Sequence, residues 1–153
     1  MTERRALYAF VIATLIVGLS ASLFTEPEIA GWYAGLAKPG FNPPNWIFAP
    51  VWTTLYVLMA FAAWRVWRVA GLRSAPLVLY LVQLVLNFAW SLIFFRAHRI
   101  ELALIDIVLL WVAILATTIA FFRRDALAGA LMLPYLAWVG FAAVLNYEIA
   151  RLN

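Results

Sequence analysis

The sequence predicts an all-α membrane protein, a bundle of five transmembrane helices. Hydrophobic residues make up 67% of the 153 residues and charged residues only 12%, against about 45–50% and about 25% in ordinary soluble domains. The apolar residues gather in five runs, each close to the roughly 20 residues that a helix needs to cross the hydrocarbon. These runs are apolar on every face, whereas barrel strands alternate. Helices satisfy their own backbone hydrogen bonds in lipid, so we expect five helices.

The predicted spans follow one another along the chain with short connections. They cover approximately residues 7–24, 46–67, 75–95, 102–122 and 126–149. All connections but the first are only a few residues long, which makes consecutive helices antiparallel. We therefore expect residues 1–153 to form a single membrane domain.

The first span has a competing interpretation as a cleaved signal peptide. Arg4 and Arg5 precede it, and Ser20-Ala21-Ser22 resembles a small-residue cleavage site. The run is longer than the usual apolar core of about 7–15 residues, so we interpret it as a retained helix.

The charges indicate an orientation rather than a nucleic-acid partner. The net charge is +4, but the basic residues sit between the apolar runs and form no basic face. Seven arginines fall on the side of the N-terminus and four basic residues fall on the other side. In a bacterial membrane this asymmetry predicts a cytoplasmic N-terminus.

The first connection, residues 25–45, is unusually long. Loops of this length in compact proteins are usually functional or disordered. Pro39, Pro43 and Pro44 stiffen it, and three aromatic residues give it apolar surface, namely Trp32, Tyr33 and Phe41. It could be a lid over the bundle, or a segment whose aromatic rings rest at headgroup level. The sequence alone leaves both interpretations open.

Aromatic and amide side chains form stripes on three of the predicted helices. Spacings of three or four residues place the members of each stripe on one helix face. The stripes comprise Trp52 and Tyr56, then Asn87, Trp90 and Phe94, then Tyr135, Trp138 and Ala142. Facing inward together, they would make a mostly apolar pocket with a few hydrogen-bonding groups, which is typical of a small-molecule site. A single stripe of this kind more often serves helix packing than binding, and it is the coincidence of the three with a lid-like loop that favours a pocket.

Other polar residues give weaker indications. Asp106 is the one acid well inside a predicted span; it could be a proton or cation site, but we favour a pairing with Arg96, His98 or Arg99. His98 lies in a connection, so we do not expect it to ligate haem. The segment with Leu145, Tyr147 and Arg151 fits a loose sterol-contact pattern. The chain has no cysteine and no catalytic or metal-binding motif.

Several motifs together resemble the TspO or translocator protein family, also called tryptophan-rich sensory proteins or peripheral-type benzodiazepine receptors. They run in order along nearly the whole chain: Trp32-Tyr33, the segment 38–44 (KPGFNPP), the segment 51–56 (VWTTLY), the segment 87–90 (NFAW), the segment 134–138 (PYLAW) and Asn146-Tyr147. One departure is Phe41, where the family pattern usually has tryptophan.

The resemblance implies ligands, partners and activities that composition does not reveal. It implies binding of porphyrins or haem, and in some members of cholesterol and benzodiazepine-type ligands, with no bound cofactor otherwise. By matching positions it implies a pocket lined by Trp52, Tyr56, Asn87, Trp90, Phe94, Trp138 and Ala142, with Trp32 on the lid. It also implies a homodimer. The leading hypothesis is therefore a tetrapyrrole sensor or transporter; the alternatives are a light-dependent porphyrin-degrading activity and an ion-coupled exporter.

Overall fold

The computed structural model describes residues 2–153 and contains five long helices. They are α1 (Glu3–Ile29), α2 (Phe48–Ala70), α3 (Ala75–Ser91), α4 (Ile100–Phe122) and α5 (Ala126–Leu152), with no strand in this part of the chain. All five, α3 together with the turn that follows it, are long and apolar enough to cross a membrane. The predicted fold class, an all-α five-helix membrane protein, is confirmed.

Several helices extend beyond the predicted spans. α1 continues to Ile29, past the predicted end at residue 24, with Pro27 inside the helix. α5 continues to Leu152, past the predicted end at residue 149. The spans were placed where charged residues begin, but a helix can continue into the headgroup region, where charges cost little. The first connection is correspondingly shorter, and it contains two 3₁₀ turns, η1 (Tyr33–Gly35) and η2 (Asn45–Ile47).

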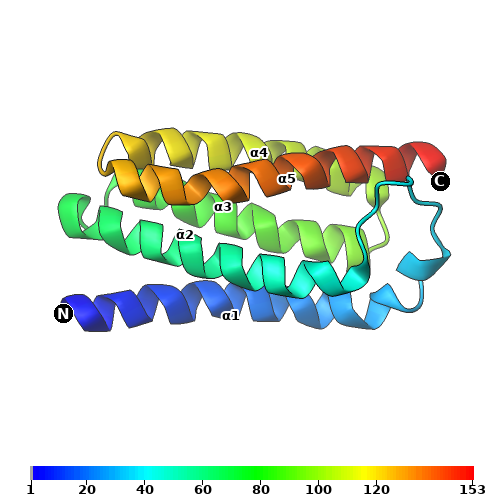
Figure 1. Cartoon of the computed structure of the whole chain (residues 1–153), viewed down its shortest axis with the longest axis horizontal. Helices are drawn as coiled ribbons and strands as arrows, with labels where there is room; N and C mark the ends of the chain where they lie inside the picture. The colour runs from blue at the N-terminus through cyan, green and yellow to red at the C-terminus, as the bar shows by residue number, and fades with distance from the viewer. Residues whose placement is uncertain (1) are drawn as a thin grey trace.

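The helices are arranged as a ring in the order α1, α2, α5, α4, α3. Each helix packs mainly against the two beside it in this order. The N-terminus and the α2–α3 and α4–α5 turns lie at one end of the bundle, and the C-terminus, the first loop and the α3–α4 connection lie at the other (Figure 1). We call these the N-terminal end and the loop end.

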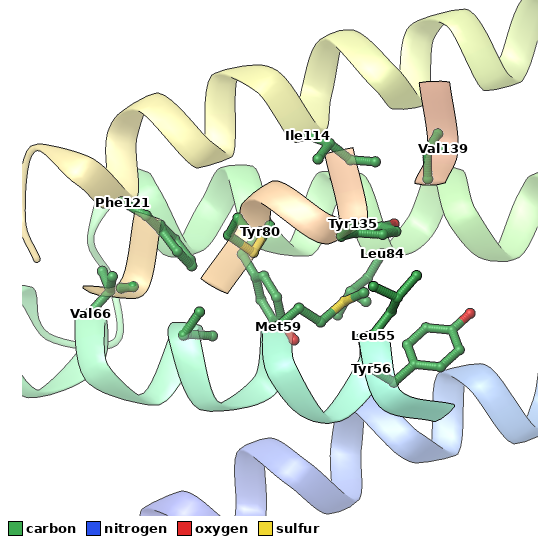
Figure 2. Close-up of a cluster of buried hydrophobic side chains, with 14 of the residues drawn as sticks. Leu55, Tyr56, Met59, Val66, Tyr80, Leu84, Ile114, Phe121, Tyr135 and Val139 are labelled. Carbon is green, nitrogen blue, oxygen red and sulfur yellow. The ribbon is translucent and has the colours of Figure 1, made fainter. Parts of the chain in front are cut away.

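The tightest packing lies toward the N-terminal end, between α2, α3, α4 and α5. Met59, Val66 and Tyr135 are among its fully buried side chains (Figure 2). Ala62 and Ala63 are also fully buried, and such small residues let membrane helices approach closely. α1 contributes little to this core, because 11% of its most apolar stretch is buried, against 28–39% in the other four helices.

α3 ends in a π-helical turn, η3 (Leu92–Arg96). Its wider backbone closes with a bond from the Ala97 amide to the Leu92 carbonyl, at 2.9 Å. Phe94 and Phe95 are neighbours in sequence, yet both are buried, with ring centroids 4.8 Å apart. Single π turns are frequent at functional sites, and this one adds two rings to the interior of the loop end.

Candidate ligand cavity

A cavity of about 340 Å³ lies among the helices toward the loop end. Such a volume is at the lower end of the roughly 300–1,000 Å³ that small-molecule sites occupy. All five helices contribute to its wall, together with the 3₁₀ turns and η3. The wall is formed by Leu15, Gly18, Leu19, Ala21, Ser22, Thr25, Glu26, Ile29, Tyr33, Asn45, Phe48, Ala49, Trp52, Thr53, Tyr56, Asn87, Trp90, Ser91, Phe94, Phe95, Ile107, Leu110, Trp138, Val139, Ala142, Leu145, Asn146 and Ile149.

The three predicted stripes meet at this cavity. Seven of the nine residues predicted to bind a ligand lie in its wall: Trp52, Tyr56, Asn87, Trp90, Phe94, Trp138 and Ala142. The helix spacing that grouped them in the sequence therefore brings them together in space. Their binding of a ligand stays a prediction.

The other two predicted ligand-binding residues lie outside the wall. Tyr135 is fully buried behind the cavity, with its ring centroid 6.2 Å from that of Trp52. Trp32 lies on the outer side of Phe94, at 5.5 Å between ring centroids, and stacks on His98 at 4.2 Å. Both support side chains that do line the cavity.

A chain of hydrogen bonds fixes the deep part of the wall. The Tyr56 hydroxyl donates to Asn87 Oδ1 at 2.7 Å, and Asn87 Nδ2 donates to the Tyr135 hydroxyl at 2.9 Å. Tyr135 in turn donates to Gln83 Oε1 at 2.7 Å. Three helices are joined through these four side chains. Because Asn87 uses both ends of its amide, the ring of Tyr56 is held in one position.

The indole groups of the wall differ in their hydrogen bonding. Trp90 Nε1 donates to Asn146 Oδ1 at 3.0 Å, and Asn146 Nδ2 donates to the Ile100 carbonyl at 3.1 Å. Trp138 Nε1 is buried but has no acceptor within residues 2–153. A buried donor without a partner is costly, and this N–H group is enclosed by the side chains around it.

The first loop covers the loop end of the cavity and is fixed at several points. Tyr33 lines the cavity, packs against Phe94 and Phe95, and donates from its hydroxyl to Asn42 Oδ1 at 3.0 Å. Burial raises the pKa of the Tyr33 hydroxyl above its ordinary value, although the bond to Asn42 partly offsets this. Of the two interpretations of the loop, this arrangement favours the lid.

The wall also contains residues that the sequence did not single out as ligand-binding. Eight come from α1, including Gly18 and Leu19. α1 has no aromatic or amide stripe, so only the small residues Gly18 and Ser22, four apart, marked one of its faces for close packing. At Gly18 a Cβ atom would lie 2.5 Å from Cε2 of Tyr56, so only glycine leaves room for that ring.

The sterol-contact pattern does not form one surface. Leu145 is buried and lines the cavity, whereas Tyr147 is 53% exposed on the outside of α5. Arg151 is exposed and pairs with Glu148 at 2.6 Å. A sterol resting on one face of α5 would therefore not contact all three.

Asp106 does not make the pairing favoured from the sequence. It is buried, and its Oδ2 atom has no hydrogen-bond partner in the described residues. No salt bridge joins it to Arg96, His98 or Arg99; His98 instead bonds Glu28, with Nε2 3.0 Å from Oε2. Within residues 2–153 there is also no cluster of three His, Cys, Asp or Glu side chains that could hold a metal ion.

Comparison with known proteins matches this architecture to one family over almost the whole chain. The profile of the TspO/MBR family matches residues 10–152. The human translocator protein is 42% identical over 148 residues, covering 94% of this chain and 88% of the relative. The tryptophan-rich protein TspO of Chlorobaculum tepidum is 42% identical over 143 residues, covering 91% and 90%. Protein CrtK of Rhodobacter capsulatus is 37% identical over 147 residues, covering 94% and 90%. The five membrane-spanning helices and these relatives identify the chain as an integral multi-pass membrane protein that belongs to the TspO/MBR family.

Proposed function

We propose that the protein binds a tetrapyrrole, a porphyrin or haem, in the cavity and acts as a sensor or transporter of it. The observation that carries the proposal is the cavity wall, in which Trp52, Trp90 and Trp138 from three helices surround one mostly apolar space. Flat aromatic molecules gain about 0.5–1.5 kcal/mol per ring contact beyond the area they bury. Such a wall favours a planar, largely apolar ligand.

The polar groups of the wall support a ligand that carries a few acceptors. The exposed amide of Asn45 is available there. The other amides, Asn87 and Asn146, are already occupied by side chains and maintain the shape of the wall. An apolar cavity with few polar groups fixes the orientation of a ligand without the cost of removing many charges from water.

The names of the relatives are in keeping with this function. One group is called translocator protein and another tryptophan-rich sensory protein, names that refer to movement and to sensing. Both activities require that a molecule is first held, and the cavity is where this chain would hold it.

A titration of the purified protein with protoporphyrin tests the proposal. We expect saturable quenching of tryptophan fluorescence, and we expect Trp138→Phe to weaken binding two- to tenfold, about the worth of one aromatic ring contact, because the smaller phenyl ring offers less area to a flat ligand. Asn87→Ala should weaken it at least as much, since Tyr56 loses its fixed position. Trp46→Phe is the matched control, because Trp46 is 74% exposed and lies outside the wall. Binding curves that coincide for wild type, Trp138→Phe and Asn87→Ala would remove the cavity as the site.

A further inference from the structure

The cavity wall is not equally buried all round. Most of its residues are buried or half-buried, but five are exposed: Leu19 and Glu26 of α1, Asn45 of η2, and Ala49 and Thr53 of α2. All five flank the seam between α1 and α2, so the cavity has a side opening between these two helices. We call it the α1–α2 opening.

The opening reaches deep enough to face acyl chains. Leu19 lies ten residues before the end of α1 at Ile29, which is about 15 Å along the helix axis. α1 has 27 residues and is about 40 Å long, some 10 Å more than the hydrocarbon core of about 30 Å. With this excess shared between its ends, Leu19 stands about 10 Å inside the hydrocarbon. Its side chain is 65% exposed there.

On the side toward the N-terminal end of the bundle, a tight contact limits the opening. Tyr56 packs against Gly18 so closely that a Cβ on Gly18 would overlap its ring. Tyr56 is itself held by its bond to Asn87. The opening therefore extends from this contact to the loop end and does not run the length of the seam.

The aqueous side, by contrast, is closed by several interactions. Asn153 bonds both backbone groups of Ala37, at 3.0 and 2.8 Å, which ties the loop to the end of α5. Tyr33 is bonded to Asn42, and Trp32 stacks on His98, which bonds Glu28. Entry through the loop would require these contacts to break together, whereas entry through the α1–α2 opening requires none of them to break.

We infer that ligands enter and leave the cavity sideways, from the half of the bilayer on the loop side, through the α1–α2 opening. The inference rests on the proposed function, in that the cavity must be the ligand site. It defines the ligand class further: the molecule must dissolve in the membrane before it binds. A water-soluble polar molecule of the same shape would reach the cavity slowly.

Narrowing the opening should slow both association and dissociation, whereas a loss of contacts to the ligand would speed dissociation. Leu19→Trp places a larger side chain at the deep edge of the opening, and Ile16→Trp is its matched control, since Ile16 is 57% exposed on the same helix but does not line the cavity. With the protein in nanodiscs of phosphatidylcholine and phosphatidylglycerol, binding of protoporphyrin is followed by its own emission in a stopped-flow instrument. We expect Leu19→Trp to slow both association and dissociation at least fivefold, and Ile16→Trp to leave both rates at their wild-type values.

A second pair of variants tests the same opening from the other helix. Ala49→Phe narrows it from α2, with Val57→Phe as the control at an exposed position outside the wall. Ala49→Phe also serves if Leu19→Trp does not fold. Asn153→Ala loosens the loop by removing its two bonds to Ala37, and we expect it to leave both rates unchanged.

The outcomes separate the route from the site. Normal rates in Leu19→Trp and Ala49→Phe would overturn the side route, and faster exchange in Asn153→Ala would assign entry to the loop instead. Absence of saturable protoporphyrin binding in the wild type would instead refute the proposed function. Association rates should also follow the mole fraction of porphyrin in the lipid rather than its concentration in water.

Discussion

Tyr56 shows how one side chain serves both stability and the cavity. Its ring lies against Gly18 of α1, and its hydroxyl donates to Asn87 of α3. The residue is buried, yet one side of it lines the cavity. Glycine at position 18 is therefore required by the ring of Tyr56 and not by the backbone of α1, which is helical there.

Gly18→Ala tests this contact. The added methyl group would meet the Tyr56 ring at 2.5 Å, and since the ring is held by Asn87, we expect α1 to move outward. Overpacking of this kind typically costs about 1–3 kcal/mol. The free energy of unfolding in detergent measures the effect, and Gly31→Ala is the control, because its Cβ would meet only the Pro27 carbonyl, at 4.0 Å. Equal stability of the two variants would show that α1 does not depend on this contact.

At the residue scale, the sequence predicted the wall where chemistry and spacing agreed. Trp52, Asn87 and Trp138 stood out because indole and amide groups deep in apolar runs are unusual and repeat with helical spacing. The part of the wall formed by α1 was not predicted, because Leu15, Leu19 and Ile29 are the residues expected on a helix surrounded by lipid. The sequence also could not distinguish Tyr135 from the wall residues, because an aromatic side chain suits a position behind the cavity as well as one that lines it.

Helices α2 and α5 are connected at the N-terminal end by an ion pair. Arg65 of α2 donates to both oxygens of Asp125, which precedes α5, with Nη2 2.8 Å from Oδ2. Asp125 Oδ1 also accepts from the Ala128 amide at 2.8 Å, as an N-cap of α5. The guanidinium of Arg65 and this cap bond hold the pKa of the Asp125 carboxyl below its ordinary value, despite its partial burial.

The lowered pKa of Asp125 predicts a pH-dependent contribution to stability. The folded carboxyl releases its proton more readily than the unfolded one, whose pKa is about 3.9. The contribution is therefore complete above about pH 5 and is lost as the pH falls through the lowered folded pKa. We expect Asp125→Asn, which retains the cap, to lose about 1 kcal/mol at pH 7. Asp125→Ala should lose about 1 kcal/mol more, because it also removes the cap.

Chemical unfolding in detergent between pH 3 and pH 7 measures this contribution, given that carboxyl titration falls in this range. The difference between wild type and Asp125→Asn should shrink as the pH falls, since both then carry a neutral side chain at this position. A difference that stayed constant with pH would contradict a role for the charge.

The number of helices and their succession along the chain were predictable from the sequence, whereas the helix ends were not. Five apolar runs separated by short charged turns leave little choice of secondary structure in lipid. The ends at Ile29 and Leu152 lie among charged residues, where helix propensity rather than hydrophobicity decides. The π turn at Leu92–Arg96 has no counterpart in the apolar pattern, which continues unbroken through it.

Charge is distributed unequally between the two ends of the molecule. Seven arginines and two acids lie at the N-terminal end, giving a side-chain charge of +5. The loop end has four basic and four acidic residues, and a fifth acid, Asp106, is buried in α4 near that end. The basic residues of the N-terminal end face the cytoplasm if the positive-inside rule holds. The cavity and its loop would then lie toward the outer leaflet.

Single cysteines test this orientation, and the natural chain has none to interfere. Gly40→Cys lies in the first loop, and Leu72→Cys lies in the α2–α3 turn, where the native side chain is 65% exposed. In a bacterial inner membrane we expect a membrane-impermeant maleimide to label Gly40→Cys in intact spheroplasts and Leu72→Cys only after permeabilisation. The reverse pattern would place the cavity on the cytoplasmic side.

The order of the helices around the bundle could not be derived from the sequence. Short turns require that α2 lies beside α3 or close to it, but the main neighbours of α2 are α1 and α5. Small buried residues such as Ala62 and Ala63 permit the close packing of these helices. Which face of each helix turns inward is not encoded by uniformly apolar spans.

The low burial of α1 has a practical consequence for the design of synthetic ligands for the proposed site. Behind the wall residues Trp52 and Asn87 stand Tyr135 and Gln83, which have no exposed surface and are bonded to each other. Substituents added on that side of a compound would collide with them, whereas substituents directed at Leu19 would extend between hydrocarbon tails. Ligands of this cavity should therefore tolerate long apolar substituents directed between α1 and α2, and almost no added substituent directed toward Tyr135.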